Sequence, residues 1–165
     1  MLKQILVLIV VFTLSSFSQD KNHIKKDISK INKTYSSNWI FYNSLNSELP
    51  DVIIRSITVD NNNIKWIGTD SGIVKIEGEK WTIFDTSNSA LPYNSIATIK
   101  VDNNNTKWIG LRYGGIVKYD DTNWTVYDTS NSGLPNNYIE SISIDSNGIK
   151  WIGTDGGGLA KYNDT

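Results

Sequence analysis

The chain contains an internal repeat, and the spacing of that repeat constrains the fold more than any other feature of the sequence. Three series of equivalent residues are 42 or 43 positions apart: Trp66, Trp108 and Trp151; Trp39, Trp81 and Trp124; Gly72, Gly115 and Gly158. In the first series each tryptophan is followed by Ile-Gly. The one extra residue falls between this Ile-Gly and the next glycine, which places it in a turn. Each repeat therefore reads as one supersecondary unit.

Four short strands are expected in each unit, at 55–59, 64–69, 73–77 and 81–85 in the first complete one. In the first of these segments Ile57 and Val59 alternate with polar residues, as in a half-buried strand. Asp and Asn residues at 60–63 favour a tight turn, and its third copy, Asp145-Ser-Asn-Gly148, is a typical hairpin signal. Four antiparallel strands per unit, with a tryptophan and paired glycines, are typical of a β-propeller blade.

The sequence therefore predicts an all-β fold, a fragment of a β-propeller with about three four-stranded antiparallel blades and part of a preceding one. The expected units are 37–52, 53–95, 96–138 and 139–165, the last of them truncated. We interpret the tryptophans as filling the space between blades, because a large ring buries area on both sides. Sugar stacking by one of them is the alternative. A structural role in the repeat is assigned to Trp66, Trp108, Trp151, Trp81, Trp124, Gly68, Gly110 and Gly153.

The N-terminal residues differ from the repeats. Residues 1–18 are predicted to be a signal peptide, because Lys3 precedes a short apolar run and small residues follow it. We expect cleavage after Ser18, with an uncleaved anchor as the alternative. Residues 19–36 are expected to form a polar linker, or else a short amphipathic helix. The signal peptide predicts a periplasmic or extracellular location, and no later segment is apolar enough to cross a membrane.

Composition excludes several classes of function. Sixteen Lys and Arg residues against 17 Asp and Glu give no charge signal for nucleic acid. The chain has no cysteine, which excludes disulfides and thiolate metal sites. Its one histidine, His23, lies in the polar linker, so the usual general base is missing from the repeats. We predict that the chain is not an enzyme and needs no cofactor.

The turns that begin at Asp60, Asp102 and Asp145 loosely resemble oxygen-rich calcium loops. A calcium site needs about six to eight oxygen donors around one ion, and here a strand begins after four residues. Capping of the turn by each aspartate is therefore the preferred interpretation, and no metal site is predicted.

Candidate ligand-binding residues are found where the repeat breaks. Arg112 and Tyr113 stand where the flanking repeats have Asp70 and Asp155. In a propeller this turn shares a face with the connections between blades, which is the usual ligand face. An Arg-Tyr pair can bind a carboxylate or stack on a sugar ring, and the framework does not require it. The connections add Tyr93, Asn94, Asn136, Asn137 and Tyr138. The alternative is that these residues are only ordinary drift between repeats.

The string Trp151-Ile-Gly-Thr-Asp-Gly-Gly-Gly-Leu-Ala-Lys-Tyr162, with Asn131-Ser-Gly-Leu-Pro135 and Asp145-Ser-Asn-Gly148 ahead of it, resembles the two-component-regulator propeller repeat. The resemblance extends from Trp39 to Tyr162. It implies a ring of several blades and a ligand-sensing role. The family occurs in periplasmic sensor halves of hybrid histidine kinases, often in polysaccharide utilisation, and in secreted multi-repeat proteins.

Three functions remain open at this stage. The first is a recognition module, the sensing part of a longer protein, with a glycan-like ligand as the resemblance implies. The second is a secreted scaffold that contacts only proteins, and the third is a propeller lyase or hydrolase. Three blades cannot close a ring, so a partial sequence is expected. Alternatively, open blade edges allow self-association, with a strand at Trp39 completing the last blade of a second copy.

Overall fold

The computed structural model describes residues 38–50 and 52–164, which belong to two compact units, residues 1–51 and residues 52–165. The second unit is made of strands and contains no helix among its described residues, as the all-β prediction requires. Its eleven strands are β1 (Ile54–Val59), β2 (Lys65–Thr69), β3 (Gly72–Glu77), β4 (Lys80–Phe84), β5 (Ile96–Val101), β6 (Lys107–Leu111), β7 (Ile116–Tyr119), β8 (Trp124–Tyr127), β9 (Ile139–Ile144), β10 (Lys150–Thr154) and β11 (Gly158–Tyr162).

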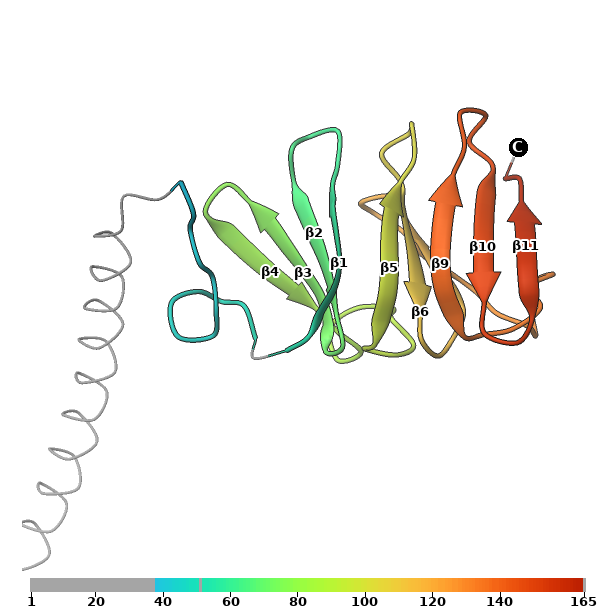
Figure 1. Cartoon of the computed structure of the whole chain (residues 1–165), viewed down its shortest axis with the longest axis horizontal. Coiled ribbons are helices and arrows are strands. Elements are labelled where there is room, and N and C mark those ends of the chain that lie inside the picture. The colour runs from blue at the N-terminus through green and yellow to red at the C-terminus, as the bar shows by residue number, and fades with distance from the viewer. Residues whose placement is uncertain (1–37, 51, 165) are drawn as a thin grey trace, which may run out of the picture. The chain divides into compact units, whose positions relative to one another are not determined.

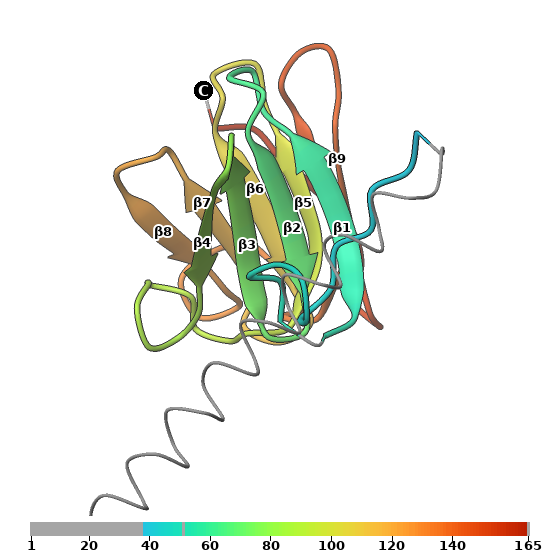
Figure 2. The same cartoon turned by 90° about the vertical axis from the view of Figure 1, so that its left-hand side faces the viewer.

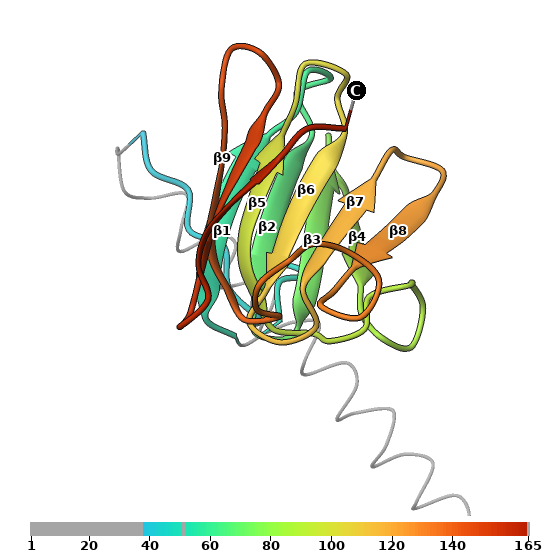
Figure 3. The ribbon, with the colours of Figure 1, turned by 90° about the vertical axis from the view of Figure 1, so that its right-hand side faces the viewer.

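These strands form three separate antiparallel sheets, one for each repeat (Figure 1). The first sheet has the order β1-β2-β3-β4, the middle sheet β5-β6-β7-β8 and the third sheet β11-β10-β9. The predicted blades are thus confirmed, with strand bounds within one residue of those expected in the first repeat. The leading strands β1, β5 and β9 lie side by side in Figure 1, and the views from the two ends of the stack show them one behind another (Figures 2 and 3).

Each leading strand carries a β-bulge at the same place. Ile54 pairs with Thr69 and Ser56 with Gly68, so Arg55 has no partner on β2. The same shift leaves Ala97 unpaired on β5 and Glu140 unpaired on β9. A bulge redirects the side chain of the unpaired residue away from the regular alternation of the strand.

Hydrophobic contacts between neighbouring sheets form the core. One cluster joins the first and middle sheets around Trp66, and another joins the middle and third sheets around Trp108. The glycine of Trp-Ile-Gly allows the close approach of the next sheet. A Cβ at Gly68 would lie 2.6 Å from Cγ2 of Ile96, and a Cβ at Gly110 equally close to Cγ2 of Ile139. Such distances are too short for any side chain, so glycine is required wherever a sheet follows.

The aspartate after each leading strand caps its turn, as the turn-capping interpretation requires. Oδ1 of Asp60 accepts hydrogen bonds from the backbone N–H groups of Asn62 and Ile64, and Oδ2 accepts one from the Trp66 indole at 2.9 Å. Asp102 and Asp145 make the same three bonds in their own sheets. Each aspartate therefore fixes both the turn and the orientation of the tryptophan.

A buried lysine connects this arrangement to the next sheet. Lys107 Nζ lies 3.5 Å from Oδ2 of Asp60 and 2.6 Å from Oδ1 of Asp121. Lys150 repeats this pattern with Asp102, at 3.8 Å, and with Asp164. Each ammonium also lies over the tryptophan of the preceding sheet, Lys107 at 5.0 Å from the Trp66 ring and Lys150 at 4.4 Å from the Trp108 ring. A buried charge needs such paired partners.

In the first unit, residues 38–50 form no strand, although the sequence predicts one at Trp39. A strand requires a hydrogen-bonded neighbour. The turn of the partial repeat is nevertheless present. The carbonyl of Asn43 accepts bonds from the N–H groups of Asn46 and Ser47, and the N–H of Leu49 donates to Oγ of Ser47. The same bonds recur at Asp85 and at Asp128, so 38–50 carries the end of a repeat.

The predicted signal peptide and polar linker lie outside the described residues. Within 38–50 and 52–164, no helix is long and apolar enough to span a membrane.

Candidate functional site

The turns that follow β2, β6 and β10 lie at the same end of the sheets as the connections β4–β5 and β8–β9. At this end the middle and third sheets frame a hollow of about 570 Å³, here called the tyrosine hollow. It is lined by Pro92, Tyr93, Tyr113, Gly114, Val126, Asp128, Asn136, Asn137, Tyr138 and Asp155. The hollow thus brings together most of the ligand residues expected from the sequence, with the exception of Arg112 and Asn94.

Three tyrosine rings form the walls of this hollow. The Tyr113 ring meets the Tyr138 ring edge to face, with centroids 5.1 Å apart, and lies 6.2 Å from the Tyr93 ring. Tyr93 and Tyr113 are more than half exposed. A Cβ at Gly114 would lie 2.6 Å from the Tyr93 ring, so only glycine lets that ring rest on the turn. Rings set at steep angles present apolar walls to a ligand rather than stacking on one another.

Arg112 points into a different hollow from its neighbour Tyr113. Its Nε donates to the Tyr138 hydroxyl at 2.7 Å, and its Cζ lies 5.4 Å from the centre of the Tyr138 ring. This hydrogen bond raises the pKa of Arg112 above its ordinary value, and the charge of Glu140 adds to the effect. The pair expected from the sequence is therefore split. Tyr113 lines the tyrosine hollow, whereas Arg112 lies outside it and orients Tyr138 through this hydrogen bond.

The second hollow has a volume of about 240 Å³ and is called the bulge hollow, because it is lined by the three bulge residues, Arg112 and the start of β1: Ile53, Ile54, Arg55, Ala97, Arg112 and Glu140. The sequence prediction missed Arg55, Ala97 and Glu140. A signal was present, since one position in an otherwise repeated strand holds Arg, Ala and Glu in successive units. The repeat tolerates this variation because the bulge residue pairs with nothing on the neighbouring strand.

The asparagines of the predicted site hold the connections in place. Oδ1 of Asn94 accepts from the N–H of Thr86 at 2.8 Å, and Oδ1 of Asn137 accepts from the N–H of Thr129 at the same distance. Asn136 donates to the carbonyl of Asp155 and accepts from the N–H of Tyr138. The bond made by Asn94 recurs at Asn137, which favours a framework role for the side-chain oxygens of these two residues. Asn136 and Asn137 also line the tyrosine hollow.

The residues assigned a structural role in the repeat differ in burial, depending on whether a neighbouring sheet covers them. Trp66 and Trp108 are buried between sheets, and Trp151 is 36% exposed on the third sheet. Trp81 and Trp124 are half-buried on β4 and β8. The Trp124 ring stacks on Tyr119, with centroids 4.0 Å apart. At Gly153 an added Cβ would meet only Oγ of Ser141, unlike the crowded sites at Gly68 and Gly110.

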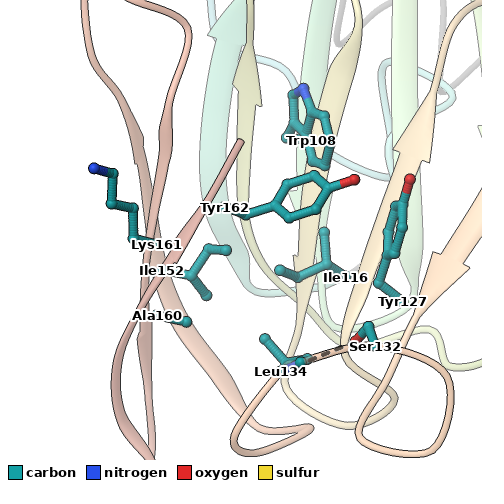
Figure 4. A pocket seen from close by; sticks show the side chains of 10 residues that line it. Trp108, Ile116, Tyr127, Ser132, Leu134, Ile152, Ala160, Lys161 and Tyr162 are labelled. Atoms are coloured by element: carbon teal, nitrogen blue, oxygen red, sulfur yellow. Dashed lines mark hydrogen bonds between the residues drawn. The ribbon is translucent and has the colours of Figure 1, made fainter. Parts of the chain in front are cut away.

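An apolar cavity of about 110 Å³ lies between the middle and third sheets (Figure 4). Trp108, Tyr127 and Tyr162 surround its upper part, and Leu134 and Ala160 its lower part (Figure 4). The hydrogen bond between Tyr162 and Tyr127, together with burial, raises the pKa of Tyr162 to about 12. In the other interface Trp124 and Val126 of β8 pack at the corresponding place. The cavity is therefore a property of sheet packing, and its lining is mainly apolar.

The electrostatics of the tyrosine hollow are mildly acidic. Asp128 and Asp155 line the tyrosine hollow. Hydrogen bonds from the side chain and backbone of Ser130 hold the pKa of Asp128 below its ordinary value, so this carboxylate is charged near neutral pH. The described residues contain no group of three His, Cys, Asp or Glu side chains that could hold a metal ion.

The sheets and hollows define a β-propeller repeat protein. Residues 133–156 match the family model described as "Two component regulator propeller". The resemblance drawn from the repeats is thus confirmed, and this part of the chain carries a two-component-regulator propeller repeat. No curated protein matches the chain at a significant level.

Solved structures from bacteria share the fold. An extracellular domain assigned to a hybrid two component system of B. thetaiotaomicron is 26% identical, with a TM-score of 0.54, over 72% of this chain and 17% of that one. A second such domain gives 20% identity and a TM-score of 0.58 over 70% and 19% of the two chains. PorZ, a surface component of the type-IX secretion system of Porphyromonas gingivalis, gives 24% and 0.55 over 66% and 17%. The chain spans less than a fifth of the length of these proteins.

Proposed function

We propose that this chain is a ligand-recognition module of a periplasmic or extracellular β-propeller, without catalytic activity, and that it serves as part of the sensing half of a two-component-type sensor. The observation that carries the proposal is the tyrosine hollow, whose three rings gather where the repeat departs from its framework. The similarity to extracellular domains of hybrid two component systems supports the sensing role.

The lining of the hollow favours a neutral glycan. Exposed rings such as Tyr93 and Tyr113 offer apolar faces to a sugar ring, and the asparagine amides offer hydrogen-bond donors to hydroxyl groups. The carboxylates of Asp128 and Asp155 would repel an acidic sugar. The guanidinium of Arg112 donates to Tyr138 and faces the bulge hollow. A neutral oligosaccharide is therefore the ligand class that fits this hollow best.

Calorimetric titration of the folded chain with panels of neutral and acidic oligosaccharides tests this proposal. A neutral sugar should bind, and Tyr113→Ala should weaken its binding about tenfold, because truncating an aromatic anchor costs about 1.4 kcal/mol or more. Tyr113→Phe, which keeps the ring, should bind within about threefold of the native chain. Thr125→Ala, an exposed change on β8 outside the hollow, is the matched control.

Two results would contradict the proposal. One is equal affinity of the native chain and Tyr113→Ala for a sugar that binds, which would remove the ligand from the tyrosine hollow. The other is binding of acidic sugars alone, weakened by Arg112→Ala and unchanged in Tyr113→Ala. That outcome would move recognition to the bulge hollow and reverse the charge preference.

A further inference from the structure

The carboxylate of Asp155, in the wall of the tyrosine hollow, lacks the role that its equivalent has in the first repeat. There, Oδ1 of Asp70 accepts a hydrogen bond from the N–H of Ile53 at 3.2 Å. In the third repeat the equivalent N–H is that of Tyr138, and it donates to Oδ1 of Asn136 at 2.8 Å instead. Among the described residues, the hydrogen bonds of Asp155 involve only its backbone. Its side chain is therefore not needed to hold the turn.

The backbone of Asp155 is nevertheless fixed beside the aromatic rings. Its N–H donates to the carbonyl of Tyr138 at 3.0 Å, and its carbonyl accepts from Nδ2 of Asn136 at 2.5 Å. Both partners line the tyrosine hollow, as Asp155 itself does. The residue is exposed, so its carboxylate is held at a fixed point of the wall and is available to a ligand.

Asp128 supplies a second carboxylate to the hollow. Its Oδ1 accepts hydrogen bonds from the N–H and hydroxyl of Ser130 and from the N–H of Asn131, whereas no described residue donates to its Oδ2. The described lining of the hollow includes no lysine, arginine or histidine. The guanidinium of Arg112 lies outside it and donates to Tyr138. The hollow therefore has two carboxylates in its wall and no cationic side chain to neutralise them.

The tyrosine rings favour the same sign of charge in a ligand. The face of an aromatic ring attracts a cation that lies within about 6 Å of the ring centre. Tyr93 is 52% exposed and Tyr113 is 57% exposed, so these rings are accessible from solvent. The third ring, Tyr138, already makes such a contact inside the protein, with Cζ of Arg112 at 5.4 Å from its centre. Rings and carboxylates thus attract the same kind of group.

We propose that the tyrosine hollow contains a subsite for a protonated amine, and that the glycan it recognises is an amino sugar. The inference rests on the proposed function, which places a sugar ring against the tyrosines, and it adds one charged group to that sugar. The ammonium group pairs with the carboxylate of Asp155, and the charge of Asp128 adds to the attraction. A hydroxyl or acetamide group at the same place on the sugar gains none of this charge interaction.

Calorimetric titration of the folded chain with matched trisaccharides tests the inference. The sugars are β-1,4-linked and differ only at C2, which carries an amine, an acetamide or a hydroxyl group. At about pH 6, where such an amine is protonated, the amine sugar should bind about tenfold more tightly than the other two. Spermidine offers the same charge without a sugar ring, and it should bind about tenfold more weakly than the amine sugar.

A matched pair of variants assigns the preference to Asp155. Asp155→Asn keeps the shape of the side chain and removes its charge, so the preference for the amine should fall to about threefold or less. Its affinity for the hydroxyl sugar should stay unchanged. Asp70→Asn is the control, because it changes the equivalent residue outside the hollow and keeps the oxygen that accepts from Ile53. It should leave the preference at its native value, and circular dichroism checks that both variants fold.

Equal affinities for the amine and hydroxyl sugars, both weakened by Tyr113→Ala, would overturn the amine subsite and leave the proposed function standing. A preference that persists undiminished in Asp155→Asn would overturn the pairing with this carboxylate. Spermidine that binds as tightly as the amine sugar would overturn the choice of an amino sugar. Failure of every sugar to bind would overturn the proposed function, and the inference with it.

Discussion

The two interfaces inside this chain use the same repeat residues but differ in how completely they are packed. Between the first and middle sheets, the Trp66 ring lies 5.9 Å from Tyr119, which stacks on Trp124 at 4.0 Å. Between the middle and third sheets, the Trp108 ring lies 5.7 Å from Tyr162, and beyond it is the 110 Å³ cavity.

The difference shows that each sheet packs against the sheet before it through two separate strands, the leading strand and the fourth strand. The leading strand and the buried lysine complete the inner part of both interfaces, with Ile99 and Ile142 equally buried. The fourth strand completes only the outer part, where β8 supplies Trp124 and Val126. The four predictions below test this division. All are measured on the single chain.

The largest effect should follow removal of a buried tryptophan. Trp108→Ala should lower the free energy of unfolding by about 3–5 kcal/mol, because the ring is 1% exposed and its indole is bonded to Asp102. Trp151→Ala should cost far less, about 1 kcal/mol, since no sheet covers that ring in the described residues. Urea unfolding followed by circular dichroism measures both. Equal losses would mean that tryptophans act within their own sheet and not between sheets.

Adding a single methyl group at the glycine of Trp-Ile-Gly should have the next largest effect. Gly110→Ala forces a Cβ to 2.6 Å from Ile139 and should cost about 1–3 kcal/mol. Gly153→Ala should be close to neutral, because its only near neighbour is a serine hydroxyl that can rotate away. Thermal melts of the two variants give the comparison. A loss at Gly153 as large as that at Gly110 would contradict the close-approach explanation.

Acid should weaken the inner part of the interface. Burial alone would raise the pKa of Asp60, but hydrogen bonds from Trp66, Ile64 and Asn62 and the charge of Lys107 hold that pKa below its ordinary value. A depressed pKa stabilises the folded state above the unfolded pKa of about 3.9, and this stability is lost as the pH falls through the lower folded value. The urea midpoint should therefore fall between pH 5 and pH 2.5. In Asp60→Asn, weaker at pH 7, the fall should be smaller, and an identical fall would refute the assignment.

The smallest effect should come from filling the cavity. Ala160 stands where the other interface has the fully buried Val117. Ala160→Val should raise the free energy of unfolding by about 0.5–1 kcal/mol, because the added methyl groups enter apolar space. Val117→Ala is the matched reverse change and should be destabilising. Destabilisation by Ala160→Val would show that the cavity is unable to accept a methyl group.

The repeat predicted nearly all of the fold, because its period, strand alternation and turn residues are local properties of the chain. The turn caps at Asp60, Asp102 and Asp145 were predicted for the same reason. The expected strand at Trp39 was wrong, since pairing depends on a neighbour that local sequence does not specify.

The candidate site was predicted less completely. The sequence indicated which turns diverge from the repeat, and the structure brings Tyr93, Tyr113 and Tyr138 together there. The sequence did not indicate that Arg112 and Tyr113 line different hollows. The directions of adjacent side chains at a turn depend on the three-dimensional path of the backbone there. The bulge residues were missed because the unpaired position follows from strand register, which involves two strands at once.

The bulges distinguish positions whose sequence the fold constrains from positions whose sequence is free to vary. Residues 55, 97 and 140 are skipped in the register with the neighbouring strand, and Arg, Ala and Glu occur there in turn within one fold. A library randomised at only these three positions would vary the charge and shape of the bulge hollow while the turn caps, glycines and lysines stayed constant. The propeller repeat thus supplies a modular scaffold in which each added sheet brings one new position for engineering a binding surface.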